Sequence, residues 1–374
     1  MKKIFTLLIM LAIVAVTSTT SAAERLIEAS GDYIMDARLD ETPASATARA
    51  REEAKRAAVE KAGTYVESYS KAINMELDTD EIRTVAARLL KVQSESPPKI
   101  EVVGDDKNLL KFVVTITALV DDIGETDLKA LMQDKKTLEE LTRKNRELQE
   151  KYDELNRQMK QYQRDFDSAD DARKVEIKKE VARNSEKFSA VDELARGNDF
   201  SARGNYSQAL TAYDTAIKLD SSLAEAYNNR GIVKYELGQY SAAIDDYSRA
   251  IQLKSGYADA FNNRGNAYAA LEQFTDSERD LKAALKLNDK SAIMHNNLGS
   301  VYFSLKKFAE AVDEYTRAVQ LNPKYADAWY NRAVAYYAQG NLVQSLLDIK
   351  QAHNLNSNDA TIIEFYEKIS RLNG

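Results

Sequence analysis

The chain has no cysteine, and it has only four prolines, two histidines and one tryptophan among 374 residues. The lack of cysteine excludes disulfides, thiolate chemistry and cysteine metal ligands, and it leaves no thiol for a lipid anchor. No basic stripe is present and the formal net charge is −7. Nucleic acid and anionic lipid are therefore excluded as expected partners. Beyond the amino-terminal segment, no apolar run approaches the roughly 20 residues that span a bilayer.

Residues 1–23, MKKIFTLLIMLAIVAVTSTTSAA, have the three parts of a secretory signal. Two lysines precede an apolar run at 4–16, and small residues form a cleavage site ending at Ala22 or Ala23. A membrane anchor is the rival interpretation, but the run is shorter than the roughly 20 residues that an anchor needs. Cleavage removes both lysines and takes the net charge from −7 to −9. We expect an exported protein, periplasmic or extracellular, with no membrane insertion after signal cleavage.

Residues 24–122 have the pattern of a small α+β domain. RLIEASGDYIM at 25–35 predicts a strand, and LLKFVVTITALV at 109–120 predicts another after the hairpin turn VVGDDKN. TYVESYS at 64–70 is expected to be extended, which gives the order β, α, β, α, β, β. Asp78 or Thr79 can cap the second helix, which is expected to end near residue 90.

The first helix of this domain, ASATARAREEAKRAAVEKAG, has a narrow face of small residues that would let it lie close against a sheet. The face consists of Ala46, Ala50, Ala54 and Ala57. Gly63 is expected to end the helix in a left-handed conformation.

The motifs G-x-Y, ARxxAxxxA, G-T-Y-V-E-S and D-x-I-R-T in this region resemble the amino-terminal domain of flagellar assembly protein T and related envelope proteins. That group has no known catalysis, so the resemblance implies an envelope location more than an activity.

Residues 125–188 are dominated by charged and amide side chains, with apolar residues at alternating spacings of three and four. Such spacing predicts a coiled coil of about five heptads. One seam position is occupied by Leu131, Leu138, Tyr152, Met159 and Phe166, and the other by Leu141, Leu148, Leu155 and Tyr162. Asn145 falls on the first seam, where a buried asparagine fixes a two-stranded register. We expect a homodimer through residues 131–166, the alternative being a helix that packs on its own chain. Ser168 to Asp171 is expected to cap a second helix reaching Phe188.

From Ala190 the chain divides into five units of 34 residues: 190–223, 224–257, 258–291, 292–325 and 326–359. We number the places in each unit from 1 to 34. Place 8 holds glycine in four units and alanine in the fifth, place 20 holds alanine or serine, and place 27 holds alanine throughout. The pattern resembles the tetratricopeptide repeat (TPR) family. The resemblance implies five helical hairpins stacked in an α-solenoid, with residues 360–374 as a capping helix. The fold class is thus mainly α.

The TPR resemblance assigns roles to the places. Small residues at places 8 and 20 would face each other where two helices cross, with large residues at places 4 and 24 around them. Places 2, 5, 6, 9 and 12 of the first helix would point into a concave groove, and we call them the groove places. They hold nine candidate peptide-binding residues: Asn198, Asn228, Asn229, Asn262, Asn263, Asn266, Asn296, Asn297 and Asn331.

An amide has both a donor and an acceptor, so asparagine can pair with a peptide backbone whatever the side chains. The column resembles the asparagine ladder of O-linked N-acetylglucosamine transferase, which holds an extended polypeptide. The other interpretation is that the asparagines bond between neighbouring helices, and the sequence leaves both open.

Two further patterns in the repeats are candidate binding sites. The first is the set of arginines at place 7 (Arg230, Arg264 and Arg332), which are followed 16 residues later by Asp246, Asp280 and Asp348. An ion pair is favoured over a ligand contact, because an unpaired buried arginine would be costly.

The carboxylate clamp of chaperone-binding TPR domains is the sharper possibility, and the sequence does not support it. Asn198 and Asn229 match its two amide positions, but Leu194, Asp259 and Asn263 replace its three cations.

No catalytic, cofactor-binding or metal-binding residue is predicted. His295 takes a place where neighbouring repeats have aromatic residues, which favours a packing role, and His353 follows on the last repeat. The chain has no glycine-rich phosphate loop and no nucleophile elbow. We therefore expect a non-enzymatic bacterial adaptor that binds an extended segment of another protein. The alternative is a structural subunit of a flagellar-type envelope assembly that docks through residues 24–122.

Overall fold

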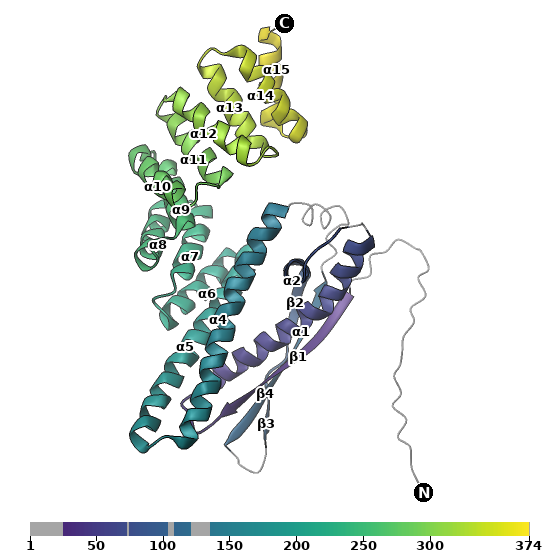
Figure 1. Cartoon of the computed structure of the whole chain (residues 1–374), viewed down its shortest axis with the longest axis vertical. Coiled ribbons are helices and arrows are strands. Elements are labelled where there is room, and N and C mark those ends of the chain that lie inside the picture. Colours follow the sequence, from purple (N-terminus) through teal and green to yellow (C-terminus); the bar gives the residue numbers. More distant parts are fainter. Residues whose placement is uncertain (1–24, 73–74, 104–107, 121–134, 374) are drawn as a thin grey trace. The chain divides into compact units, whose positions relative to one another are not determined.

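The computed structural model describes residues 25–72, 75–103, 108–120 and 135–373 (Figure 1). The expected signal peptide, the start of the coiled coil with Leu131, and the tip of the predicted hairpin turn lie outside these residues. The chain forms two compact units. The first comprises residues up to Arg38 with Ala46–Asp153, and the second comprises Leu39–Ser45 with Glu154–Gly374.

The first unit contains a four-stranded antiparallel sheet with β4 (Leu109–Val120) in its centre. β1 (Arg25–Asp36) pairs with β4 along its whole length. β2 (Leu90–Glu95) and β3 (Lys99–Val102) pair with different parts of its other edge. Alternate side chains of β4 are buried, as expected for a strand with one covered face. Both strands predicted from the sequence are confirmed, whereas β2 was not predicted.

α1 (Pro43–Ala72) packs on this sheet through the predicted alanine face. Ala46, Ala50 and Ala54 are fully buried, and Ala58 rather than the half-buried Ala57 completes the face. A Cβ atom placed on Gly31 of β1 would lie 2.1 Å from the Ala54 nitrogen. The helix backbone therefore meets the strand backbone directly, which only small residues on both sides permit.

The predicted helix end at Gly63 is wrong, because α1 continues to Ala72 and the stretch predicted as extended is helical. A Cβ atom on Gly63 would lie 3.4 Å from Ile82 Cγ2, so this glycine lies at a close approach of α1 and α2 (Thr79–Leu89). Val66, in the extension, is fully buried in a cluster with residues of α2. That burial offsets the cost of about 1 kcal/mol for glycine inside a helix. The observed order is β, α, α, β, β, β.

The predicted cap of the second helix is confirmed. Asp78 accepts a bond of 2.8 Å from the Glu81 backbone nitrogen, and the Glu81 carboxylate accepts one of 2.9 Å from the Asp78 nitrogen. These reciprocal bonds form a capping box.

The predicted coiled-coil segment contains α4 (Lys135–Ser168), followed by α5 (Asp171–Ala202). The side-chain amide of Asn184 on α5 donates bonds of 3.1 Å to the Leu155 carbonyl and 3.2 Å to Gln158 Oε1 of α4. Seam residues of α4 are buried within the single chain, namely Leu138, Tyr152, Leu155, Met159 and Phe166. Asn145 is exposed. The arrangement therefore has the packing of α4 on its own chain, the alternative that the sequence left open.

α5 begins as predicted, with the Asp170 carboxylate accepting a bond of 2.8 Å from the Arg173 nitrogen. The predicted helix end at Phe188 is wrong, since α5 runs unbroken to Ala202 and includes the first helix of repeat 1. No glycine or proline separates Gly124 from Gly197, so nothing in the sequence interrupts it.

The repeats form the predicted tandem of helical hairpins, in which each helix contacts the next. Repeat 1 pairs the end of α5 with α6 (Tyr206–Leu219). Repeats 2 to 5 are formed by α7 (Ala224–Glu236) with α8 (Tyr240–Leu253), α9 (Ala258–Ala270) with α10 (Phe274–Leu287), α11 (Ala292–Ser304) with α12 (Phe308–Leu321), and α13 (Ala326–Ala338) with α14 (Leu342–Leu355). α15 (Ala360–Asn373) covers the last hairpin, where Tyr366 stacks on His353 with ring centroids 5.1 Å apart.

The glycine at place 8 faces place 24 more closely than the expected place 20. A Cβ atom on Gly231 would lie 2.7 Å from Cε1 of Tyr247, and one on Gly265 would lie 2.8 Å from Cγ of Leu281. The missing side chain therefore makes room for the large residue that fills the hairpin. In repeat 5, Ala333 at this place packs near the smaller Ile349.

Candidate functional site

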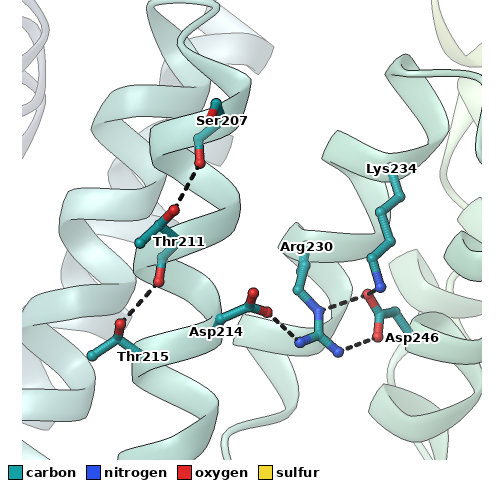
Figure 2. A network of polar contacts seen from close by, with 7 residues as sticks. All are labelled: Ser207, Thr211, Asp214, Thr215, Arg230, Lys234 and Asp246. Atoms are coloured by element: carbon teal, nitrogen blue, oxygen red, sulfur yellow. Dashed lines mark hydrogen bonds and ion pairs between the residues drawn. The ribbon is translucent and has the colours of Figure 1, made fainter.

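Arginine–aspartate pairs hold each hairpin together in three of the repeats, as predicted. In repeat 2, the Arg230 Nε and Nη2 atoms donate bonds of 2.8 and 2.5 Å to the two oxygens of Asp246 (Figure 2). Arg264 with Asp280 and Arg332 with Asp348 have the same bidentate geometry. All three aspartates are buried. Two parallel bonds to a buried carboxylate give a strong, orientation-specific contact.

The third guanidinium nitrogen ties each repeat to the one before it. Arg230 Nη1 donates a bond of 2.6 Å to Asp214 on α6, and Figure 2 shows the guanidinium between Asp214 and Asp246. The matching nitrogens of Arg264 and Arg332 reach Ser248 at 3.0 Å and Thr316 at 3.1 Å. The hydrogen bond to Asp246 is the main cause that raises the pKa of Arg230 above its usual value. These arginines are part of the framework and are not free to bind a ligand.

Repeat 4 departs from this scheme. Leu298 occupies the arginine place, and His295 Nδ1 lies 2.6 Å from Glu314 Oε2 on the partner helix. The other ring nitrogen of His295 lies 3.2 Å from the Asp289 carbonyl oxygen. His295 was predicted to be a packing residue, and the structure gives it a polar contact as well. The paired changes at places 7 and 23 are the sequence signal that could have revealed it.

The asparagines form a hydrogen-bonded column that runs from repeat to repeat. Each place-6 amide nitrogen donates to the place-5 amide oxygen of the preceding repeat. These bonds join Asn263 to Asn228 at 3.2 Å, Asn297 to Asn262 at 2.9 Å and Asn331 to Asn296 at 2.9 Å. In the first junction, Asn229 donates to Asn198 at 2.8 Å. The column thus has the helix-to-helix bonds of the second interpretation.

Burial divides the nine predicted asparagines into two groups. Asn228, Asn262 and Asn296 at place 5 are 3, 8 and 7% exposed, so they belong to the framework. The others are half-buried or exposed: Asn198, Asn229, Asn263, Asn266, Asn297 and Asn331. The inter-repeat bond uses one of the two N–H groups of each place-6 amide. The side chains of this second group are therefore held at the surface in fixed orientations.

A hollow of about 320 Å³ lies beside this column, between α9 and α11. We call it the α9–α11 hollow. It is lined by Tyr235, Asn266, Ala269, Ala270, Phe274, Asn297, Ser300, Val301 and Ser304. The lining includes residues from places 6, 9 and 12, so the structure brings together side chains that were predicted to share a groove. The sequence analysis did not single out Ala269 or Phe274.

The described part of the chain offers few signs of any other kind of site. Within it, no group of three or more His, Cys, Asp or Glu side chains is placed to hold a metal ion. None of its helices combines the length and the apolarity needed to cross a membrane.

Comparison with known protein families identifies the repeats. The TPR repeat model matches residues 197–238, 233–272 and 299–340, and the tetratricopeptide repeat model matches residues 258–291. The carboxy-terminal part of the chain therefore consists of tetratricopeptide repeats. All matched segments lie between residues 197 and 340, so the resemblance of residues 24–122 to flagellar assembly protein T stays a prediction.

Several solved structures are similar to the chain. YrrB, described as a TPR protein with an unusual peptide-binding site, is 26% identical over 50% of this chain and 95% of its own, with a TM-score of 0.42. MamA is 22% identical over 44% of this chain and 96% of its own, with a TM-score of 0.41. PilF of Pseudomonas aeruginosa is 20% identical over 50% of this chain and 85% of its own, with a TM-score of 0.47. No curated protein matches the chain.

Proposed function

We propose that the chain is an exported bacterial adaptor whose repeats bind an extended segment of another protein along the groove places. One observation supports this proposal above the others. The place-6 amides form a column at the surface, and buried place-5 amides hold each of them in position. Preorganised amides lose little conformational freedom when they bind a peptide backbone, which favours affinity.

The test is a cross-linked pull-down from envelope extract with the mature chain, read by mass spectrometry. The variant changes Asn229, Asn263, Asn297 and Asn331 to alanine together. A matched control changes three exposed residues of the second helices, Ser207, Ser241 and Thr275, to alanine. Circular dichroism and thermal unfolding establish that both variants are folded.

A partner that the native chain and the control capture, and that the folded asparagine variant loses, supports binding along the column. Equal capture by all three proteins would refute it, since the amides would then serve only to join the repeats.

Export is part of the same proposal. Edman sequencing and intact mass of the protein from fractionated cells should show a chain that starts at residue 23 or 24 and lies outside the cytoplasm. A full-length chain in the cytoplasmic fraction would contradict it.

The dimer expected through residues 131–166 has less support than the adaptor. Seam residues that would form its interface are buried within one chain, among them Tyr152 and Met159, each 1% exposed. We therefore propose one chain as the binding unit and expect sedimentation at the mass of a monomer. A dimer that is lost when Asn145 is changed to lysine would show instead that the exposed side of α4 pairs with a second copy.

The competing function is a structural subunit of an envelope assembly. Exposed apolar residues on the strands of the first unit favour it, namely Leu26, Ile100 and Val102 at 64, 53 and 59% exposure. Changing Ile100 and Val102 to serine should release a structural subunit from the envelope fraction. An adaptor with the same two changes should keep both its location and its partner.

A further inference from the structure

The α9–α11 hollow exists because one repeat lacks an aromatic ring that other repeats have. Place 12 holds Tyr235 in repeat 2, Phe303 in repeat 4 and Tyr337 in repeat 5, but Ala269 in repeat 3. Place 13 of repeats 3 and 4 is also small, with Ala270 and Ser304. All three small residues line the hollow, so the missing side-chain volume coincides with it.

In repeats 2 and 4, the ring at place 12 packs on the ring at place 17 of the same repeat. Tyr235 and Tyr240 have centroids 5.1 Å apart, and Phe303 and Phe308 have centroids 5.3 Å apart. Repeat 3 keeps the place-17 ring as Phe274, which lines the hollow instead. A ring supplied from outside would meet Phe274 with the spacing and tilt that aromatic pairs prefer.

The polar residues beside the hollow suit the backbone of such a ligand. Asn266 and Asn297 both line the hollow, and Asn297 is fixed by its bond of 2.9 Å to Asn262. An amide can accept from a peptide N–H or donate to a peptide carbonyl. A chain lying along these amides would therefore be held extended while one of its side chains enters the hollow.

Charge restricts the ligand further. The hollow has no charged residue in its lining. Across the five repeats, the groove places contain Glu225, Asp259 and Asp327 but no lysine or arginine. A ligand with carboxylates near its aromatic side chain would be repelled, whereas lysine or arginine at its flanks would be attracted.

We infer that the α9–α11 hollow binds an aromatic side chain of an extended protein segment flanked by lysine or arginine. This inference rests on the proposed function and names the kind of segment that the column binds. About 320 Å³ is enough for one large side chain, and Phe274 would complete the ring pair that the other repeats make internally.

The test uses the mature chain and a phage-displayed library of random 12-residue peptides. Enriched peptides are then synthesised with a fluorophore, and their dissociation constants are measured by fluorescence polarisation. We expect the enriched peptides to share one Phe, Tyr or Trp, with basic and no acidic neighbours. Replacing that aromatic residue with alanine should weaken binding at least tenfold.

Ala269→Tyr is the decisive variant, because it fills the hollow with the residue that repeats 2 and 5 already have at the same place. It should weaken peptide binding at least tenfold. Ala309→Tyr adds the same side chain at an exposed position of α12 and should leave binding unchanged. Phe274→Leu is a second variant, which introduces the residue that repeat 5 has at the same place, Leu342, and it should also weaken binding.

The asparagine variant separates the two proposals. Peptides that are lost by the asparagine variant but bind Ala269→Tyr and Phe274→Leu normally would overturn the hollow and leave the adaptor intact. Peptides that all variants bind equally would overturn both. Enrichment of acidic or non-aromatic peptides would overturn the inference about the hollow alone.

Discussion

Removing Arg332 tests whether the arginine–aspartate pairs hold the hairpins together. Arg332 donates two bonds, of 2.6 and 2.9 Å, to Asp348, and its guanidinium carbon lies 4.7 Å from the centre of the Trp329 ring. The side chains of Arg332 and Asp348 are only 12 and 5% exposed. We consider Arg332→Leu, which places in repeat 5 the residue that repeat 4 has at Leu298.

The expected loss comes mainly from the stranded carboxylate. Breaking a buried ion pair by removing one partner costs about 3–5 kcal/mol, because the other charge stays buried without compensation. The contact with the Trp329 ring contributes about 0.5–2 kcal/mol more. Leucine recovers part of this by burying apolar surface, so we expect a net loss of about 3 kcal/mol.

The double variant Arg332→Leu/Asp348→Ala should be more stable than the single one by about 2 kcal/mol, since no buried charge remains. Alanine is the residue that repeat 1 has at the same place, Ala212. A stability order in which removing a second residue restores part of the loss is specific to a buried charge pair.

Urea unfolding followed by tryptophan fluorescence provides the assay. Trp329 is the single tryptophan of the chain and lies in repeat 5, so its signal reports the unfolding of that hairpin. Repeat arrays can unfold in parts, so midpoints and slopes are compared together. Arg371→Leu is the control, because its pair with Glu367 is exposed and should change stability by less than about 0.5 kcal/mol.

If Arg332→Leu lost less than about 1 kcal/mol, the pair would not be a main contact of the hairpin. If the double variant lost the sum of the two single losses, the two side chains would act independently, and the charge-pair explanation would be refuted.

Three further predictions concern the packing of the repeats. Gly231→Ala should lower the free energy of unfolding by about 1–3 kcal/mol in urea, because its Cβ atom would lie 2.7 Å from the buried Tyr247 ring, whereas Gly256→Ala, with open space around it, should not. Lys306→Gly should raise stability by about 1 kcal/mol in thermal unfolding, because Lys306 has a φ of 60° at a turn where three repeats have glycine; lower stability would contradict the strain. Burial raises the pKa of Tyr315 to about 12, so the folded state keeps its proton while the unfolded state loses it at about pH 10. Stability should therefore fall between about pH 10 and 12, and less in Tyr315→Phe; equal pH profiles of the two proteins would refute this effect.

The repeats could be predicted from the sequence because their contacts recur with the chain. A small residue at place 8 and a large one at place 24 make the same contact in each hairpin, so the 34-residue period reveals it several times over. The arginine–aspartate pairs follow the same logic, since a spacing of 16 residues recurs three times.

Gly63 shows what a single occurrence cannot reveal. Glycine ends helices, but it also permits close approach, and the sequence contains no second copy to decide between these roles. The contact with Ile82, 19 residues away, settles it. The seam of α4 has the same difficulty, because spacings of three and four specify an apolar stripe but not which chain covers it.

The asparagines show a finer limit. Spacing placed all nine on one side of the first helices, and burial then divides them. One residue along a helix is a rotation of about 100°. That rotation separates the buried Asn262 from the half-buried Asn263 and is enough to assign one to the framework and the other to the surface.

The departures from the repeat pattern indicate where specificity lies. The recurring contacts, from place 8 to place 24 and from place 7 to place 23, build the same hairpin each time, so they cannot favour one ligand position over another. The departures gather where repeats 3 and 4 meet: Ala269 replaces a ring in repeat 3, and Leu298 with the His295–Glu314 contact replaces the ion pair in repeat 4. The α9–α11 hollow lies at this same junction. A solenoid that must bind one register of an extended chain needs one place unlike the others, and this junction provides it.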